Sequence, residues 1–369
     1  MILKSISYTN IRNLKDDTLI PSENITVFTG ENAQGKTNIL ESIHICCTGR
    51  SHRTNRDNEV IKIGKESAYI DVKCQRREGL NRIEIALKSQ NKKAISINGY
   101  PAKRLGELMG QMTCVMFSPE DLSLVISGPQ HRRKFIDIAL SQINPKYFYA
   151  LQNYQKVLVQ RNTLLKNISF NKKNIDTLSI WNEQLAKYGS EIYILRKDFI
   201  KQISIKSNQI HNHISGGREN LTIVFMSNLK GETIEQAYEN FLAMLEKNQE
   251  IDIKRQATQI GIHRDDIKLM LDEIEVRTQG SQGQKRTTAL SLKLSEIQIM
   301  NEYSGEMPIL LLDDVFSELD KNRRKWLLKY IENIQTFITC VDIESTSLKN
   351  KDNVKIIRIA DGKMTEEEN

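Results

Sequence analysis

The sequence lacks long runs of apolar residues. Its densest run, residues 307–312, has the length of a strand, whereas a membrane helix needs about 18 consecutive apolar residues. Residues 1–14 contain Lys4 and Arg12 and lack the apolar core of a secretory signal. These absences argue against a membrane protein and a secreted protein, and they predict a cytoplasmic protein with no membrane partner.

Cysteine is scarce, and no internal repeat or low-complexity segment is present. The five cysteines are odd in number and do not have the spacing of metal ligands. Their positions are Cys46, Cys47, Cys74, Cys114 and Cys340. We therefore expect small buried side chains, and neither a disulfide framework nor a zinc site.

The composition is that of a globular protein, with 39% hydrophobic and 27% charged residues. A chain of 369 residues is too long for one ordinary core, so two or three lobes are expected. Lysine and arginine (53) exceed aspartate and glutamate (46), which gives a formal charge of +7. This excess is compatible with a polyanionic partner, but also with a protein that is simply basic.

Three stretches of the chain differ in pattern. Residues 1–128 contain short β-rich segments, with a hairpin turn predicted at Asn98-Gly99, and residues 129–215 have the apolar spacing of helices. Residues 216–369 return to alternating helices and strands, and the acidic end at 366–368 is expected to be disordered. The pattern predicts an α/β protein with a helical arm between its first and last parts.

The strongest motif is a glycine-rich loop between a predicted strand at 25–28 and a predicted helix. Residues 30–37, Gly-Glu-Asn-Ala-Gln-Gly-Lys-Thr, match the pattern G-x-x-x-x-G-K-[ST]. In such a loop, backbone N–H groups and the helix N-terminus favour phosphates. Lys36 would reach the β- and γ-phosphates and Thr37 would bind Mg²⁺. The motif predicts a nucleotide-binding site.

A second motif ends an apolar segment at 308–312 with two carboxylates, Asp313 and Asp314. This is the form of a Walker B segment, in which Asp313 would hold Mg²⁺ and Asp314 would polarise the attacking water. The alternative is a buried strand capped by solvated aspartates. The glycine-rich loop favours the first interpretation, so Lys36, Asp313 and Asp314 are the predicted catalytic residues.

Between these motifs, Ser281-Gln282-Gly283-Gln284 precedes a helical stretch. Ser-x-Gly-Gln resembles the signature of ABC-type ATPases, because a small hydroxyl and a bare backbone at a helix N-terminus can approach a γ-phosphate. The order of the glycine-rich loop, helical insertion, signature and Walker B segment is that of ABC heads. Residues 317–320 resemble the D-loop, which lines the dimer interface in that class.

Further stretches narrow the resemblance to the RecF family. They lie, in collinear order, at residues 9–14, 49–54, 117–122, 128–137, 160–162, 181–185 and 261–266. The resemblance implies an α/β fold of the ABC/SMC class. Its P-loop ATPase head, with a mixed sheet and an antiparallel β lobe, would be made from the two ends of the chain, and an α-helical arm would be inserted between them.

The resemblance also implies a function. ATP and Mg²⁺ would bind one subunit and be closed over by Ser281 and Gly283 of a second, so that a homodimer forms on single-stranded or gapped DNA. Members of the family act with RecO and RecR to place RecA on DNA, in replication, recombinational repair and the SOS response. The implied nucleotide-binding residues are Arg12, Gly30, Glu31, Asn32, Ala33, Gln34, Gly35, Lys36, Thr37, Asn38, Ser281, Gly283 and Gln284.

Two departures from the wider ABC pattern qualify this expectation. Asp314 stands where most transporters and SMC proteins carry the longer glutamate, which predicts slow hydrolysis. No Q-loop glutamine follows the strand expected at 112–117, and no switch histidine follows residues 337–340. These gaps argue against a transporter subunit.

DNA contacts are expected from cationic side chains, which neutralise phosphates and release counterions. Two basic clusters are candidates: Arg50, Arg53 and Arg56, and Arg132, Arg133 and Lys134. The alternative for each residue is a solvated face or an internal salt bridge, and Arg50 could instead approach the nucleotide. His263, Arg264 and Asp265 could either support the nucleotide site or be purely structural.

Three other classes of protein share part of the pattern. A transporter ATPase subunit would not need the long helical insertion, and an SMC-like chromosome organiser would need a much longer coiled-coil arm. A small-molecule kinase would leave Ser281-Gln282-Gly283-Gln284 unexplained. The sequence therefore favours an ATP-dependent DNA-binding protein with weak, DNA-dependent ATPase activity.

Overall fold

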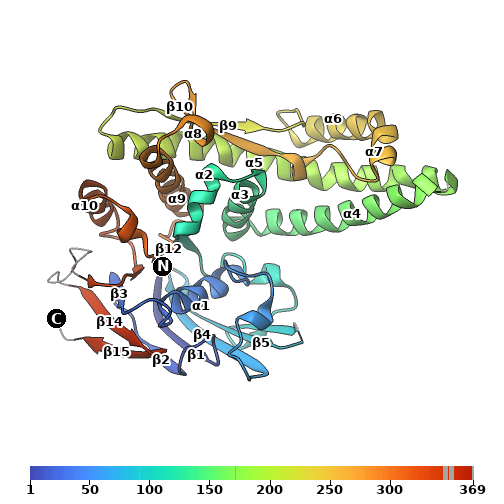
Figure 1. The fold of residues 1–369 in the computed structure, drawn as a ribbon. Helices are drawn as coiled ribbons and strands as arrows, with labels where there is room; N and C mark the ends of the chain where they lie inside the picture. Colours follow the sequence, from blue (N-terminus) through green and yellow to red (C-terminus); the bar gives the residue numbers. More distant parts are fainter. Residues whose placement is uncertain (91, 171, 344–347, 349–352, 368–369) are drawn as a thin grey trace. The chain divides into compact units, whose positions relative to one another are not determined.

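The computed structural model describes every residue except 91, 171, 344–347, 349–352 and 368–369. The chain divides into two compact units (Figure 1). The first unit contains residues 1–122 and 292–369, and the second contains residues 123–291. In sequence, the second unit is therefore an insertion in the first.

These boundaries differ from the positions 128 and 215 that the sequence indicated. The larger difference is at the second boundary. Strand β9 (Leu221–Met226) and helix α6 (Ile234–Lys247) both pack against the long helix α5 (Leu178–Ser215). This packing places the segment after residue 215 with the helices and not with the first unit.

A six-stranded sheet, parallel except for one edge strand, contributes residues to the cavity described below. Its strands, in spatial order, are β15 (Lys363–Glu367), β14 (Val354–Ala360), β3 (Ile25–Thr29), β13 (Thr336–Thr339), β12 (Ile309–Asp313) and β8 (Cys114–Phe117). All residues of β3, β13, β12 and β8 are buried, as expected for a parallel sheet covered on both faces. The carboxyl ends of β3, β12 and β13 meet at one edge.

The second sheet of this unit is antiparallel. Its order is β2 (Asp17–Leu19), β1 (Ile2–Thr9), β4 (Ser67–Arg76), β5 (Gly79–Lys88), β6 (Lys92–Ile97) and β7 (Tyr100–Pro101). Burial alternates along β4, so one face of the sheet packs inward. Asn98 and Gly99 have φ angles of 54° and 82° between β6 and β7, which confirms the predicted hairpin turn.

Helix α1 (Lys36–Thr48) lies between the two sheets. It contacts β4 and β5 of the antiparallel sheet and β8, β12 and β13 of the other. Ten of its 13 residues are buried, because the helix is covered by a sheet on each side. All five cysteines are buried, as predicted for small apolar side chains.

The first unit is completed by short helical segments and one further helix. They are η1 (Asp57–Glu59), η2 (Leu105–Glu107), η3 (Pro119–Leu122), η6 (Val315–Glu318) and α10 (Lys321–Tyr330). Asp320 caps α10 by accepting hydrogen bonds from the N–H groups of Asn322 and Arg323, both at 3.0 Å. The helix therefore begins directly after the stretch that resembles a D-loop.

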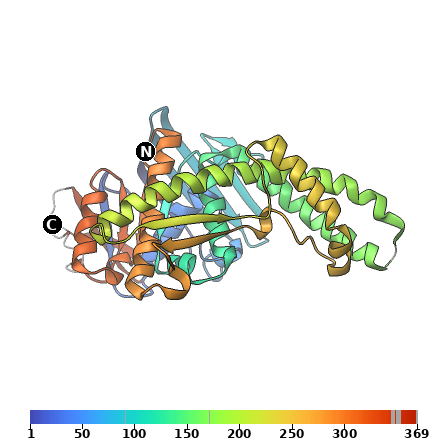
Figure 2. The ribbon, with the colours of Figure 1, turned by 90° about the horizontal axis from the view of Figure 1, so that it is seen from above.

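The second unit is mostly helical, as the sequence predicted for its first half. Its helices are α2 (Ser123–Ile126), α3 (Pro129–Ile143), α4 (Pro145–Phe170), η4 (Lys172–Thr177), α5, α6, α7 (Gln249–Arg255), η5 (Ile262–Arg264) and α8 (Val276–Gln279). A three-stranded sheet of β9, β10 (Asp266–Leu271) and β11 (Ile274–Glu275) runs along α5 (Figure 2). Helix α9 (Gln282–Ser304) begins in this unit and ends in the first.

The acidic end of the chain differs from its prediction. Glu366 and Glu367 belong to β15, which pairs antiparallel with β14, and the Lys355 ammonium lies 2.8 Å from the Glu366 carboxylate. A partner strand and an opposite charge thus order this segment, while Glu368 lies outside the described residues.

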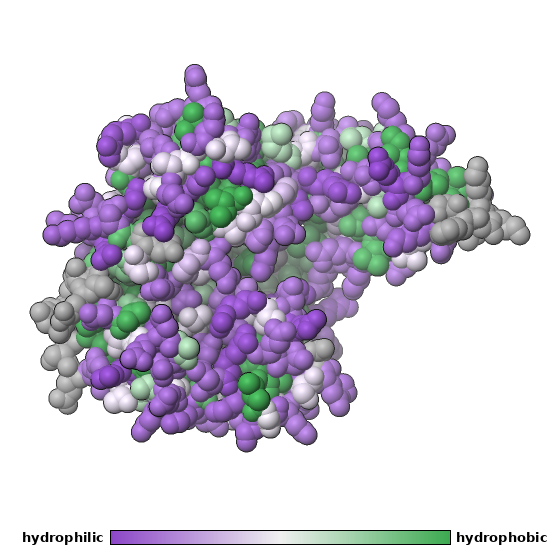
Figure 3. Space-filling view, in the orientation of Figure 1, coloured by the Kyte–Doolittle hydropathy of each residue, from purple (hydrophilic) through white to green (hydrophobic). Residues whose placement is uncertain are grey.

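No helix in the described part of the chain is both long enough and apolar enough to cross a membrane. On the face drawn in Figure 3, hydrophilic residues dominate and apolar residues form small separate groups. Scattered apolar side chains of this kind are normal on a folded protein.

Candidate nucleotide-binding site

A tight loop joins β3 to α1 and requires glycine at both ends. Gly30 has a φ of 139° and Gly35 has a φ of 114°. A Cβ on Gly30 would lie 2.3 Å from the carbonyl oxygen of Ile359, and a Cβ on Gly35 would lie 2.7 Å from the Leu14 side chain. Gly30 can therefore approach β14, and Gly35 can approach Leu14, because these positions lack a side chain.

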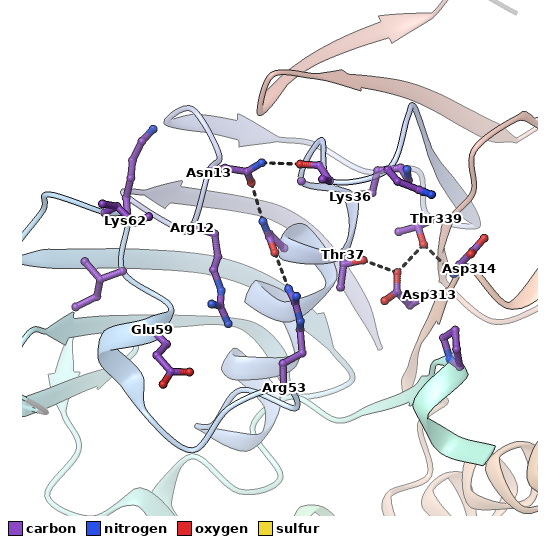
Figure 4. A pocket seen from close by; sticks show the side chains of 17 residues that line it. Arg12, Asn13, Lys36, Thr37, Arg53, Glu59, Lys62, Asp313, Asp314 and Thr339 are labelled. Atoms are coloured by element: carbon purple, nitrogen blue, oxygen red, sulfur yellow. Dashed lines mark hydrogen bonds between the residues drawn. The ribbon is translucent and has the colours of Figure 1, made fainter. Parts of the chain in front are cut away.

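The loop opens onto a cavity of about 690 Å³ (Figure 4). Its lining residues belong entirely to the first unit: Arg12, Asn13, Asn32, Ala33, Gly35, Lys36, Thr37, Asn38, Arg53, Glu59, Ile61, Lys62, Ile63, Pro119, Asp313, Asp314 and Thr339. The volume lies within the range of about 300–1,000 Å³ that is usual for small-molecule sites. Six of the nine residues predicted at 30–38 are among the lining residues, together with Arg12 and both aspartates.

Lys36 lies at the N-terminus of α1 and is only 8% exposed. Its ammonium donates hydrogen bonds to the carbonyl oxygens of Gly30 and Glu31, at 2.6 and 2.7 Å. Burial lowers the pKa of Lys36, and the nearby carboxylates of Asp314 and Asp313 act in the opposite direction. The loop thus holds a cation at the helix N-terminus, where anions are favoured.

The carboxyl end of β12 meets the start of α1 through Asp313. The hydroxyls of Thr37 and Thr339 both donate to Oδ1 of Asp313, at 2.8 and 2.7 Å, and the backbone N–H of Asp314 donates to the Thr339 hydroxyl at 2.9 Å (Figure 4). Hydroxyl and carboxylate oxygens are the hard donors that Mg²⁺ prefers. The donor set of Thr37 and Asp313 therefore fits a magnesium ion.

A chain of polar side chains closes the opposite side of the cavity. Asn13 donates to the carbonyl of Ala33 at 2.9 Å, Asn38 donates to Asn13 at 2.7 Å, and Arg53 donates to Asn38 at 3.0 Å (Figure 4). Neither Asn13 nor Thr339 was among the residues that the motifs predicted for the site. Asn13 lies within a stretch already linked to the family, but the position of Thr339 became apparent only from the sheet order.

The loop residues predicted to bind the nucleotide have different environments. Asn32 and Ala33 line the cavity. The side chain of Gln34 instead accepts a hydrogen bond from the N–H of Asp361 at 2.6 Å, which ties the loop to the turn between β14 and β15. This contact gives Gln34 a structural role in the first unit.

The signature-like residues lie in the second unit. Ser281 and Gln284 form reciprocal hydrogen bonds at the start of α9: Gln284 N–H to the Ser281 hydroxyl at 3.2 Å, and Ser281 N–H to the Gln284 side chain at 2.7 Å. Such a capping box stabilises a helix N-terminus. Ser281 is exposed and Gly283 is half-buried, so this helix start is accessible within its unit.

The first basic cluster is mainly at the surface. Arg50 is exposed, and the Arg56 side chain is 76% exposed with its guanidinium 3.7 Å from Glu59. Arg53, at 42% exposure, lines the cavity and binds Asn38. Within this cluster, Arg53 is thus positioned toward the nucleotide site, whereas Arg50 and Arg56 face solvent.

The second basic cluster contradicts one prediction. The Arg132 side chain is 4% exposed, and its guanidinium is bound to both carboxylate oxygens of Asp266, at 2.6 and 2.9 Å, and to two backbone carbonyls. A buried, fully engaged guanidinium cannot reach a DNA phosphate. Arg133 is half-buried and donates to the carbonyl of Asp265 at 2.6 Å, while Lys134 is exposed.

Several family-like stretches of the second unit converge on a buried arginine network. Arg161 donates to Asn182, Asp252 and Thr258 at 2.7–2.8 Å. Arg196 donates to Tyr147, Asp137, Asp265 and the carbonyl of Ile262 at 2.7–3.0 Å. Both arginine side chains are at most 2% exposed. We call these residues the arginine network; it links α3, α4, α5, α7 and the segment after α7.

His263 lies beside this network and contacts one of its members, Thr258. Its Nε2 lies 3.1 Å from the carbonyl of Thr258 and its Nδ1 lies 2.8 Å from the Tyr154 hydroxyl, so Nε2 donates and Nδ1 accepts. Burial lowers the pKa of His263 to about 4. His263 and Asp265 therefore lie in a structural network of the second unit.

Comparisons with known proteins find relatives along nearly the whole chain. Residues 2–366 match the family described as RecF/RecN/SMC N terminal domain. The DNA replication and repair protein RecF of Ruminiclostridium cellulolyticum is 45% identical over 93% of this chain and 94% of its own length. RecF of Acetivibrio thermocellus is 42% identical over 98% of this chain and 99% of its own length.

Solved structures show the same fold. One described as the recombination mediator protein RecF-ATP in the RecFOR pathway has a TM-score of 0.93 and 37% identity, and covers 100% of this chain and 98% of that one. An SMC head domain from Pyrococcus furiosus, bound to the C-terminal domain of ScpA, has a TM-score of 0.57 and 16% identity. The match covers 99% of this chain and 95% of that one, and it shows a similar fold alone. The chain belongs to the RecF family of ABC/SMC-type ATPases.

Proposed function

We propose that the first-unit cavity binds Mg²⁺-ATP. The observation that carries this proposal is the convergence of Lys36, Thr37 and Asp313 at one edge of the parallel sheet. Lys36 would bind the β- and γ-phosphates, and the oxygens of Thr37 and Asp313 would hold the metal. When bound, Mg²⁺ would neutralise charge on the phosphates. The ATP complex described for a structural relative supports this assignment.

Asp314 is the proposed catalytic base for ATP hydrolysis. It lines the cavity directly after Asp313, at a φ of 50°, and the Ser317 hydroxyl donates to its carbonyl at 2.7 Å. The carboxylate of aspartate is one methylene shorter than that of glutamate, so it extends less far toward an attacking water. The proposed reaction is therefore slow, and a steady-state rate of many turnovers per second would contradict it.

ATP is proposed to act mainly as a switch for self-association. Ser281, Gly283 and Gln284 form an accessible helix N-terminus in the second unit, and such a terminus favours anions. In a homodimer, this helix start of one subunit would contact the γ-phosphate held by the other. The stretch at 317–320, which precedes α10, would lie at the same interface by its resemblance to a D-loop.

The dimer is proposed to act on single-stranded or gapped DNA in the cytoplasm. Curated relatives are named DNA replication and repair proteins, and a structural relative is described as a recombination mediator in the RecFOR pathway. The formal charge of +7 and the exposed Arg50 and Arg56 are compatible with a polyanionic partner. Cooperation with RecO and RecR in loading RecA, DNA stimulation of the ATPase and a link to the SOS response are part of this proposal.

The test is to measure self-association and DNA binding with and without ATP for wild type, Lys36→Ala and Ser281→Arg. Both variants should lose ATP-dependent dimerisation. Only Lys36→Ala should lose ATP binding, because Ser281 would act on the nucleotide of the other subunit. Dimerisation that is unchanged in both variants would contradict the shared site.

A further inference from the structure

Glu41 is a buried carboxylate in α1 that has no place in the function proposed so far. Its side chain is 0% exposed, and it is not among the described residues that line the cavity. The Arg12 guanidinium binds both of its oxygens, through Nε at 3.0 Å and Nη2 at 2.8 Å. The Ser51 hydroxyl donates a further hydrogen bond to Glu41. A buried charge is thus satisfied by partners from two other segments.

The pairing with Glu41 fixes Arg12 at the edge of the cavity. A bidentate contact sets the plane of a guanidinium as well as its position. The backbone is also held, because the Arg12 N–H donates to the carbonyl of Val60 at 2.9 Å. The side chain remains 23% exposed and lines the cavity. Arg12 is therefore a prepositioned cation at the proposed nucleotide site.

A second arginine reaches the same carboxylate from the loop after α1. The Arg53 guanidinium lies 3.9 Å from Oε2 of Glu41 and donates to Asn38 at 3.0 Å. The Ser51 hydroxyl accepts hydrogen bonds from the N–H groups of Arg53 and Thr54, at 3.0 and 3.2 Å. Glu41 thus binds the side chain of Ser51, which in turn shapes the loop that carries Arg53.

We propose that Glu41 is a positioning residue for nucleotide binding, which holds the Arg12 and Arg53 guanidiniums where they bind the phosphates. Two arginines share one carboxylate, so the cluster keeps a net positive charge beside the cavity, which attracts an anionic ligand. The carboxylate lies behind the cavity wall and acts only through these arginines. This inference rests on the proposed binding of ATP at the cavity.

The test compares Glu41→Gln with Glu306→Gln, a matched loss of a buried carboxylate. Glu306 is 4% exposed and is bound by Arg76 at 3.0 Å and by the Arg77 N–H at 2.7 Å, in the same unit but outside the cavity lining. Both variants should lower the unfolding temperature, because each weakens a buried ion pair. Only Glu41→Gln should weaken binding of Mg²⁺-ATP, by about tenfold, since charge-assisted hydrogen bonds orient its arginines.

A double-mutant cycle with Arg12→Ala shows whether Glu41 affects ATP binding through Arg12. If Glu41 acts mainly through Arg12, adding Glu41→Gln to Arg12→Ala should weaken ATP binding much less than it does in wild type. If the double variant binds ATP a further tenfold more weakly than Arg12→Ala, Glu41 does not act through Arg12. Ser51→Ala, which keeps the charge and removes one hydrogen bond, is the milder variant if Glu41→Gln does not fold, and it should weaken ATP binding about threefold.

Two outcomes separate this inference from the proposed function. If wild type binds Mg²⁺-ATP and the two glutamine variants bind it equally well, Glu41 has only a structural role and the inference is overturned. If wild type does not bind Mg²⁺-ATP, the proposed function fails and this inference fails with it. A selective loss in Glu41→Gln supports both.

Discussion

Arginines paired with carboxylates occur in both units, but their surroundings differ. In the first unit, Arg12 and Arg53 share Glu41 and also line an open cavity. In the second unit, Arg161 and Arg196 are almost completely buried, and their hydrogen bonds go to protein groups. The comparison suggests that the first cluster binds a ligand, whereas the second joins helices.

The stretches that resemble the RecF family fall into two groups, one at the cavity and one in the arginine network. The stretches at 9–14, 49–54 and the glycine-rich loop contribute to the cavity. The stretches at 160–162, 181–185 and 261–266 contribute Arg161, Asn182 and His263 to the arginine network. Resemblance to a family therefore marks residues that maintain the fold as well as residues that contact the proposed ligand.

The largest effect on stability is expected for Arg161→Met. This change leaves Asp252 buried without its cationic partner, which typically costs about 3–5 kcal/mol of unfolding free energy. Urea denaturation measures the loss, and titration with Mg²⁺-ATP should show unchanged affinity in the folded variant. If stability falls by less than about 1 kcal/mol, the arginine network is not a main structural element.

Acid should destabilise the second unit through His263. Burial lowers the pKa of this histidine to about 4 in the folded state, below the ordinary histidine pKa of 6.5. Between pH 6.5 and about 4 the unfolded chain therefore binds a proton that the folded chain does not, so stability falls as the pH falls. The loss through His263 should approach about 3 kcal/mol near pH 4.

This pH dependence can be assigned with His263→Asn, which cannot be protonated. Denaturation at several pH values should show a shallower loss of stability between pH 6.5 and 4 than in wild type. Parallel curves for the two proteins would show that His263 is not the group responsible.

Replacement of Lys36 should have the largest effect on the cavity. Lys36→Ala removes a cation at the α1 N-terminus, and hydrogen bonds from charged groups to a ligand are worth up to about 3 kcal/mol, or roughly a hundredfold in affinity. Calorimetric titration with Mg²⁺-ATP measures the loss. Affinity within threefold of wild type would remove Lys36 from the proposed site.

The smallest effect is expected for the surface arginines. Arg56→Ala should weaken DNA binding less than tenfold and reduce the salt dependence of the affinity by about one counterion, because Arg56 is mostly exposed. Arg82→Ala, which removes an arginine paired with Asp71 on the antiparallel sheet of the same unit, is the control. An equal change in both variants would indicate a general charge effect and no specific contact.

Much of the cavity could be predicted from the sequence, because its main parts are local patterns. The buried strand β3, the glycines of the loop and the start of α1 are adjacent in the chain. The approach of Asp313 to Thr37 followed from pairing two motifs of known order. Thr339 lies beside Asp313 and Thr37 because β13 is placed between β12 and β3, and no local sequence pattern indicates this strand order.

Other features depend on contacts between distant segments and could not be read from local patterns. The burial of Arg132 requires Asp266, which is 134 residues away in the chain. Glu366 and Glu367 form a strand because β14 is available as a partner. The boundary near residue 291 instead of 215 reflects the packing of β9 on α5.

The most direct test of the account is to measure both Mg²⁺-ATP affinity and unfolding free energy for Lys36→Ala and Arg161→Met. We expect Lys36→Ala to lose ATP affinity while its stability is retained, and Arg161→Met to lose stability while its ATP affinity is retained. Loss of ATP affinity in folded Arg161→Met, or its retention in Lys36→Ala, would contradict the distinction between the two regions.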